Sequence, residues 1–215
     1  WLPHIERAAS RTIALTQRMD DPELEALHIK VALLGSAETG KTALAAHLCS
    51  RPLPRSYQPT NGLRVLQAVW SVAASTAHAK AQQQQQQSVD VELWDVGALS
   101  ETVFQHDYLR RSSLRDVSVV AILVSLVDRA SLVEAKRIAE LFDPVPGARF
   151  DASTPKLVVL TKCDLFMRAE LSRMEVVEFF EARGTRCIGI ANSGDADVEE
   201  LRRAIVDAVR LNAAQ

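Results

Sequence analysis

The segment Gly35-Ser-Ala-Glu-Thr-Gly-Lys-Thr42 has the residue types and the spacing of a loop that binds phosphate groups. Its glycines would let the loop curl so that backbone N–H groups face an anion. Lys41 could reach the outer phosphates of a nucleotide, where it would also act in catalysis, and Thr42 could give its hydroxyl to Mg²⁺. A glycine-punctuated surface turn is the alternative, but chance would place the full pattern in only about 1% of chains of this length. We expect nucleotide contacts from Gly35, Glu38, Thr39, Gly40, Lys41, Thr42 and Ala43.

The elements on either side of this loop are the ones that phosphate binding needs. Ile29–Leu34, apolar except for Lys30, predicts a buried strand, and Ala43–Cys49 predicts a helix. The positive end of that helix would point at the phosphates, because the first N–H groups of a helix have no partner within it. The order of strand, loop and helix therefore favours a nucleotide site over a surface turn.

A second group of residues could hold a metal ion beside the phosphates. Asp95 ends the apolar strand Val91–Trp94, and a carboxylate in that place can hold Mg²⁺ through water, with the turn at Gly97 near the last phosphate. Thr60, in Tyr57-Gln-Pro-Thr-Asn-Gly62, could supply a second hydroxyl. Each is also a common turn pattern when taken alone. The predicted metal ligands are Thr42, Thr60 and Asp95.

A third group could bind the base of the nucleotide. Thr161-Lys-Cys-Asp164 follows the apolar run Leu157–Leu160, and a carboxylate there can accept the N1–H and N2–H of guanine while the stem of Lys162 covers the ring. Ile190-Ala-Asn192 ends the last strand, where a backbone amide could meet the guanine O6. Base contacts are expected from Thr161, Lys162, Asp164, Ala191 and Asn192.

Length and composition indicate one α/β domain. The 215 residues are 47% hydrophobic, which is enough to bury a core, and the net charge of −2 gives no field that would attract nucleic acid. Strand-like and helix-like segments alternate, which predicts a mostly parallel sheet with helices on both faces. Further strands are expected at Leu63–Trp70, Val89–Val96, Val117–Val127 and Cys187–Ile190, and further helices at Thr102–Arg111, Ser131–Phe142, Ala169–Ala182 and Val198–Leu211.

Cysteines and chain ends bear on the compartment. The three cysteines are widely spaced and lack a C-x-x-C pair, which favours reduced thiols in a cytoplasmic setting. No apolar run reaches the roughly 18 residues of a membrane span. The last residues, Leu211–Gln215, contain no cysteine for prenylation, so no lipid anchor is expected in this chain.

Two segments fall outside the alternation. Residues 1–19 could form a helix before Asp20-Asp-Pro22, either packed on the domain or extended as a partner-binding arm. Residues 71–88 are of low complexity and include Gln82–Gln87, which favours an extended loop between two strands. We therefore divide the chain into an N-terminal helical extension, 1–27, and one domain, 28–215, with an insertion at 71–88.

The order of these motifs resembles the Ras superfamily of small GTP-binding proteins over about residues 28–211. The resemblance implies a P-loop NTPase fold of three layers, with six strands and about five helices. It also implies GTP or GDP with Mg²⁺ as cofactors, and two switch segments that respond to the γ-phosphate. The first switch contains Thr60, and the second runs from Asp95 to about Arg111 with phosphate contacts from Gly97 and Ala98.

Within that superfamily the chain is similar to divergent Rab-like proteins that work in cilia. Gly40-Lys-Thr-Ala-Leu44, the Trp-Asp-x-Gly form at Trp94–Gly97 and Asp128-Arg-Ala-Ser131 resemble the Rab-like GTPase of the ciliogenesis and planar-polarity effector complex. Tyr57–Val65 equally resembles the Rab-like subunit of the intraflagellar transport train. The resemblance implies protein effectors that bind both switch segments, and a cytoplasmic location at the cilium, flagellum or its base. Nucleic acid is not an expected partner.

Departures from the family pattern concern hydrolysis and the base. After Asp95-Val-Gly97 the family usually continues Gly-Gln, whereas this chain has Ala98-Leu99. The glutamine orients the attacking water, and leucine has no group for that task, so Leu99 is a degenerate catalytic position. Thr161 replaces an Asn and Ile190 a Ser, and we expect both changes to remove hydrogen bonds that brace the base loop.

Three functional hypotheses remain open from the sequence. The protein could be a GTP-dependent binding switch with weak hydrolysis, in ciliary or vesicle trafficking. It could be a GTPase whose missing group is replaced by a partner or by Glu101, Gln105 or His106. It could also be a structural subunit of a ciliary assembly that holds nucleotide as a static cofactor.

Overall fold

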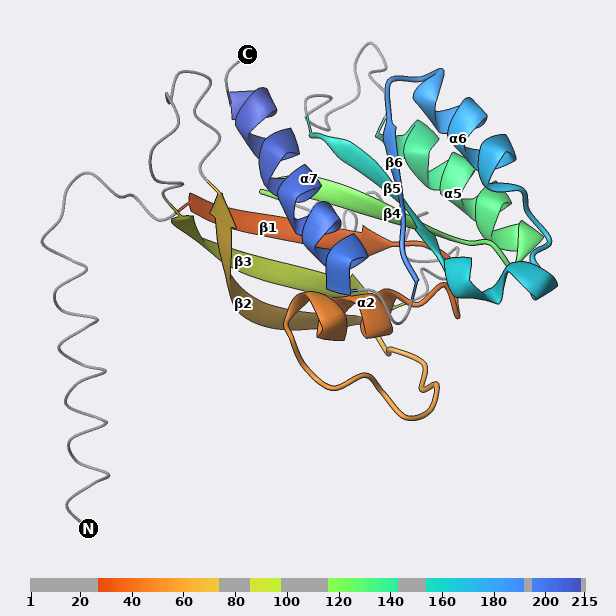
Figure 1. Ribbon diagram of the computed structural model, residues 1–215, viewed down its shortest axis with the longest axis horizontal. Helices are drawn as coiled ribbons and strands as arrows, with labels where there is room; N and C mark the ends of the chain where they lie inside the picture. The colour runs from red at the N-terminus through yellow and green to blue at the C-terminus, as the bar shows by residue number, and fades with distance from the viewer. Residues whose placement is uncertain (1–26, 74–85, 98–115, 143–153, 192–194, 214–215) are drawn as a thin grey trace, which may run out of the picture.

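The computed structural model describes residues 27–73, 86–97, 116–142, 154–191 and 195–213 (Figure 1). Their strands form one six-stranded sheet in the order β2-β3-β1-β4-β5-β6. Only the β2–β3 pair is antiparallel within the described sheet, and the other four pairs are parallel. The predicted α/β fold is confirmed. The strands are β1 (Leu27–Leu34), β2 (Leu63–Ala73), β3 (Gln86–Val96), β4 (Val119–Ser125), β5 (Lys156–Thr161) and β6 (Arg186–Gly189).

Helices cover both faces of this sheet (Figure 1). One core cluster joins α2 and α7 to the side chains of β1 that include Ile29 and Leu33. The opposite cluster joins α5 and α6 to Ala32 and Leu34 of the same strand. The strand is therefore mostly apolar, because both its faces are buried. The helices are α2 (Lys41–Leu48), α5 (Arg129–Leu141), α6 (Arg173–Glu181), α7 (Asp195–Ala213) and the short 3₁₀ helix η1 (Cys163–Arg168).

Helix boundaries differ from expectation where capping decides them. The helix expected at Ser131 begins two residues earlier, because the Asp128 carboxylate accepts the Ala130 N–H at 2.9 Å. The helix expected from Ala169 begins only at Arg173, because Ser172 has an extended backbone with ψ of 136°. The sequence prediction was wrong for that first turn. The helix expected at Thr102–Arg111 lies outside the described residues, as does the helix expected in residues 1–19.

The hairpin strands are longer than the apolar runs suggested. Ser71 pairs with Ser88, and Ala73 with Gln86, so both ends of the expected 71–88 loop belong to the sheet. The polar residues Gln86–Ser88 extend the ladder because strand pairing is made by the backbone. Residues 74–85 lie outside the described part of the chain.

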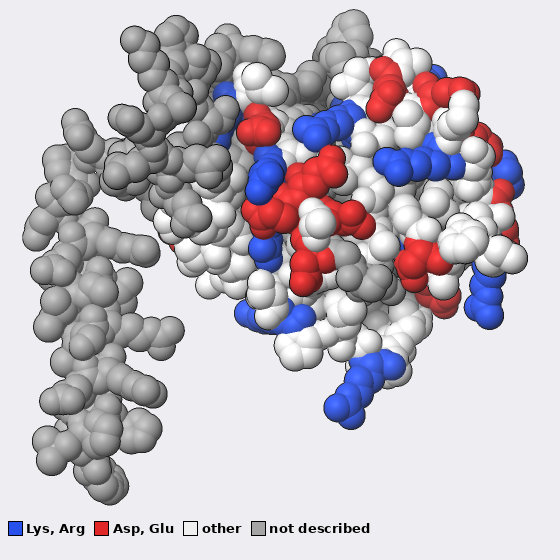
Figure 2. All heavy atoms as spheres, viewed as in Figure 1, with Lys and Arg blue, Asp and Glu red and all other residues white. Residues whose placement is uncertain are grey.

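Acidic and basic side chains are mixed over the face shown in Figure 2, with acidic groups gathered along α7 and Lys or Arg side chains beside them. Glu199 on α7 lies 3.4 Å from Arg202 and 3.7 Å from Arg203. This mixture agrees with the small net charge of −2. None of the described helices is long and apolar enough to cross a membrane.

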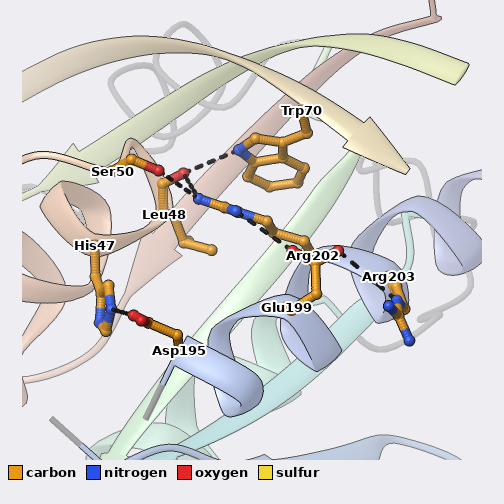
Figure 3. A network of polar contacts seen from close by, with 8 residues as sticks. All are labelled: His47, Leu48, Ser50, Trp70, Asp195, Glu199, Arg202 and Arg203. Atoms are coloured by element: carbon orange, nitrogen blue, oxygen red, sulfur yellow. Dashed lines mark hydrogen bonds and ion pairs between the residues drawn. The ribbon is translucent and has the colours of Figure 1, made fainter. Parts of the chain in front are cut away.

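A polar junction joins α7 to α2 and β2 (Figure 3). The Arg202 guanidinium donates to the Leu48 carbonyl at 2.8 Å and to the Ser50 hydroxyl at 3.1 Å. The indole N–H of Trp70 donates to the same carbonyl at 3.0 Å, and the guanidinium lies 5.8 Å from its ring. Arg202 therefore closes the C-terminal end of α2, where helix carbonyls have no partner within the helix.

We expect Arg202→Ala to lower the free energy of unfolding by about 2 kcal/mol, because a charged, largely buried donor is removed from the end of α2. The measurement is chemical denaturation. Arg203→Ala is the matched control, since Arg203 contacts the same Glu199 but its side chain is 63% exposed. Its effect should stay within about 0.5 kcal/mol. Equal losses in the two variants would contradict the role of Arg202.

Candidate functional site: a phosphate-binding cleft

The predicted phosphate loop connects the carboxyl end of β1 to α2. Gly35 and Gly40 have φ of 147° and 92°, and Glu38 between them has φ of 60°. A Cβ at Gly35 would lie 2.8 Å from the Leu123 carbonyl oxygen, so the loop passes too close to β4 for any side chain there. The positive φ values turn the chain back on itself within a few residues. The loop thus curls as the sequence predicts.

Lys41, at the start of α2, points back into this loop. Its ammonium donates to the carbonyls of Gly35 at 2.8 Å and Ser36 at 2.6 Å, and the residue is only 6% exposed. Burial lowers the pKa of Lys41 from 10.5 to about 8, although the nearby carboxylates of Asp95 and Glu134 act in the opposite direction. The result is a desolvated cation at the base of the loop, which an anionic phosphate would stabilise.

The three predicted metal ligands lie together beside that cation. The Thr42 hydroxyl donates to Asp95 Oδ2 at 2.7 Å and lies 3.0 Å from the Thr60 hydroxyl, which is itself 3.3 Å from Asp95 Oδ2. Asp95 is fully buried, and its Oδ1 atom has no hydrogen-bond partner among the described residues. A buried carboxylate oxygen without a partner is costly unless something else satisfies it. Hard oxygen donors of this kind suit Mg²⁺.

Gly97 brings the end of β3 against the segment that carries Thr60. A Cβ there would collide with the Thr60 carbonyl oxygen, so the close approach requires glycine. The Gly97 N–H donates to the Gly62 carbonyl at 2.8 Å and is therefore used in the β2–β3 hairpin. Gly97 lines the cleft as expected, but its N–H is already hydrogen-bonded to Gly62.

The base motif is tied to the phosphate loop by a bond that the sequence did not suggest. The Thr161 hydroxyl donates to the Thr39 carbonyl at 2.7 Å, with the Val124 carbonyl at 3.3 Å. The expectation that threonine in place of asparagine removes the bracing bond is wrong here. The Thr161 hydroxyl, at the end of β5, reaches the Thr39 carbonyl of the phosphate loop. Phosphate loop and base motif are thus joined directly.

The other described residues of the base group, Lys162, Asp164 and Ala191, lie at the same edge of the sheet. Lys162 has a left-handed backbone with φ of 59°, which starts η1, and Asp164 is exposed on that helix. Ala191 follows β6, and its N–H donates to the carboxylate of Asp197 at 3.1 Å. This amide therefore already has an acceptor, which the sequence analysis did not anticipate. Asp197 in the first turn of α7 was the available signal, because an acidic residue there accepts backbone N–H groups.

A cleft of about 810 Å³ runs along these groups. It brings together Glu38, Gly40, Lys41, Thr42, Ala43, Thr60, Gly97, Thr161 and Lys162. Gly35, Thr39, Asp95, Asp164 and Ala191 are described but are not among the lining residues. Ala98, Leu99 and Asn192 lie outside the described residues, as do Glu101, Gln105 and His106.

The lining is cationic. Besides Lys41 and Lys162 it includes Arg55 and Arg64, and Glu38 is its one acidic residue among those that the structure describes. The two arginines were not predicted from the sequence, although their position on either side of Thr60 was a signal for them. Positive charge along a narrow cleft favours a polyphosphate ligand.

Comparison with known families supports this geometry. The family described as Ras of Complex, Roc, domain of DAPkinase matches residues 30–164, which is more than half of the chain. The match spans the phosphate loop, the hydroxyl–carboxylate cluster and the base motif, and ends at Asp164.

Three individual proteins resemble the chain at sequence identities below 30%. The chain is 29% identical over 188 residues to ciliogenesis and planar polarity effector 2 of Danio rerio, covering 86% of this chain and 69% of the relative. It is 25% identical to the Homo sapiens protein of that name, covering 71% of this chain and 54% of the relative. It is 26% identical to GTP-binding protein rho3 of Schizosaccharomyces pombe, covering 65% of this chain and 58% of the relative.

One of these relatives is named as a GTP-binding protein. The chain spans little more than half the length of two of them. With a family match over residues 30–164, a mixed six-stranded sheet and a lysine-bearing phosphate loop in place, the chain belongs to the Ras superfamily of GTPase domains.

Proposed function

We propose that the protein is a guanine-nucleotide-dependent binding switch that uses GTP, GDP and Mg²⁺ and hydrolyses GTP slowly. The observation that supports this most is the cluster of Thr42, Thr60 and Asp95 beside the ammonium of Lys41. Thr60 belongs to the segment between α2 and β2, so a ligand that draws this hydroxyl also draws that segment. Such coupling is what a nucleotide switch requires.

The residues present fit Mg²⁺. Thr42 and Thr60 would supply hydroxyl ligands, and Asp95 would hold the ion through its carboxylate or through water. The bound ion would neutralise charge on the β- and γ-phosphates. Among the described residues, no cluster of histidine, cysteine and acidic side chains offers a competing metal site.

Guanine selectivity is assigned to Asp164, and we expect Asp164→Asn to relax it. A carboxylate accepts both N1–H and N2–H of guanine, whereas an amide offers only one acceptor oxygen. The GTP-to-ATP affinity ratio should fall on the order of tenfold or more, measured by equilibrium titration of each nucleotide. Glu170→Gln, a like change on an exposed acid beyond the base motif, is the control. An unchanged ratio in Asp164→Asn would contradict the assignment.

A partner surface lies next to Thr60. Leu63, Val65 and Val69 are 41%, 46% and 61% exposed on β2, which is the edge strand of the sheet. Exposed apolar side chains along an edge strand favour contact with another protein. Because β2 follows directly from the Thr60 segment, nucleotide state could alter this surface.

We assign the partner to a ciliary assembly, at the cilium or its base in the cytoplasm. Two relatives carry the name ciliogenesis and planar polarity effector 2. A polarity-effector complex is therefore favoured over the intraflagellar transport train that the sequence also suggested. The proposed partner contacts are those of the two switch segments together with the exposed apolar side chains of β2.

The test is affinity capture with wild-type protein loaded with either GTP or GDP, read by mass spectrometry. A switch predicts that ciliary proteins are recovered with the GTP form and depleted with the GDP form. Val65→Glu with Val69→Glu should abolish that recovery. Val133→Glu, at an exposed position of α5, should not. Equal recovery with both nucleotides would contradict the switch and support a static structural subunit.

A further inference from the structure

The backbone N–H of Ala191, two residues after β6, donates to an acidic side chain. The Ala191 N–H donates to Asp197 Oδ2 at 3.1 Å. Asp197 lies in the first turn of α7 and is half-buried, and its carboxylate lies against the backbone of Ala191. The bond joins two residues six positions apart across the start of the helix.

This amide lies at the base end of the cleft. Ile190, the residue before it, lines the cleft, and the Ile190 N–H donates to the Leu160 carbonyl at 2.7 Å. The Ile190 carbonyl accepts the Cys163 N–H at 3.3 Å, between Lys162 and Asp164 of the base motif. Ile190, next to Ala191, is therefore bonded directly to the motif that would hold the base.

An N–H group has one hydrogen, and a carboxylate is a stronger acceptor for it than a neutral carbonyl oxygen. Guanine O6 could take this hydrogen only by displacing a charged acceptor, and it would then lie near that negative charge. The exchange offers little gain in free energy. Position 6 of the base should therefore contribute little to affinity.

We propose that Asp197 determines how the base is read, by keeping the Ala191 N–H from O6. This inference rests on the proposed binding of guanine nucleotides. Guanine is then recognised by Asp164 through N1–H and N2–H, and O6 contributes little to the affinity. Asp197 acts through Ala191 and is a positioning residue rather than a direct ligand of the base.

A purely structural cap at the start of α7 gives a different expectation. Removing a cap would weaken the binding of every nucleotide by the same factor, because the start of α7 would be less stable while the contacts to each base atom stayed the same. Asp195 provides a matched control on the same helical turn. Its carboxylate contacts the His47 ring at 3.2 Å instead of the base turn (Figure 3).

The experiment measures the affinities of GDP and 6-thio-GDP by equilibrium titration. The thio compound has sulfur in place of O6, a weak acceptor, and keeps N1–H and N2–H. The proteins are wild type, Asp197→Ala, Asp197→Asn and Asp195→Ala, each checked by thermal melting. We expect wild type to bind the two nucleotides within about threefold of each other.

Asp197→Ala should free the amide and raise the preference for GDP over 6-thio-GDP by about fivefold, which corresponds to one ordinary hydrogen bond. Asp197→Asn, which keeps a neutral acceptor, should give an intermediate preference and also serves if the alanine variant fails to fold. Asp195→Ala should keep the wild-type ratio.

An unchanged ratio in both Asp197 variants, even with weaker overall binding, would overturn the inference and leave guanine binding intact. A strong preference for GDP already in wild type, or an equal rise in Asp195→Ala, would overturn it as well. Absence of GDP binding by wild type would overturn the proposed function and this inference together.

Discussion

Lys41→Ala is expected to abolish nucleotide binding, with a loss of affinity on the order of a hundredfold or more. The ammonium is the one cation placed inside the described phosphate loop, within 2.8 Å of two of its carbonyls. Its burial lowers the pKa of Lys41 to about 8, so the folded protein holds a poorly solvated charge that a phosphate would pair. Equilibrium titration with fluorescent GDP measures the loss.

The control for this prediction is Lys136→Ala. Lys136 lies on α5, with its ammonium 4.1 Å from the Phe179 ring, and does not line the cleft. Its removal changes the net charge equally and should leave affinity within about twofold. Far-ultraviolet circular dichroism of both variants verifies folding. If folded Lys41→Ala bound GDP as wild type does, the cleft would not be the nucleotide site.

Leu99→Gln is expected to raise the rate of GTP hydrolysis, on the order of a hundredfold at most. Hydrolysis needs a water held in line with the γ-phosphate, and leucine has neither donor nor acceptor for it. Leu99 lies outside the described residues, so this prediction rests on its place after Asp95-Val-Gly97. Wild type should remain GTP-bound long after loading.

The double variant Ala98→Gly with Leu99→Gln should hydrolyse faster still, because glycine restores conformational freedom to the turn. Single-turnover assays on wild type, single and double variants make the comparison, with Leu99→Ala as the control that enlarges space without adding a polar group. If wild type matched the double variant, another group would position the water. The slow-switch account would then be wrong, and a working GTPase would replace it.

The fold was predictable where local pattern and burial agree. The run Ile29–Leu34 is apolar at every position except Lys30, and β1 is indeed buried on both faces. The limits of β2 and β3 were not predictable, because Ser71 and Gln86–Ser88 pair through backbone groups that side-chain types do not reveal. The 3₁₀ helix Cys163–Arg168 was missed for a related reason: it has no buried side chain and hence no hydrophobic period.

Within the site, motif spacing predicted which residues meet but not how they bond. Thr42, Thr60 and Asp95 come together as expected from their places at the ends of strands and loops. The Thr161–Thr39 bond spans 122 positions, and outside the site the Arg202–Leu48 bond spans 154. Contacts of this range depend on how strands and helices pack, and a single sequence does not specify that packing residue by residue.

The central claim is tested most directly by titrating the isolated wild-type protein with GTP and with ATP, each with Mg²⁺ and with a chelator. The account predicts that GTP binds at least about a hundredfold more tightly than ATP and that chelation weakens GTP binding. The first result would reflect the base motif, and the second the oxygen cluster around Asp95. Equal affinity for the two nucleotides, or GTP binding indifferent to Mg²⁺, would contradict it.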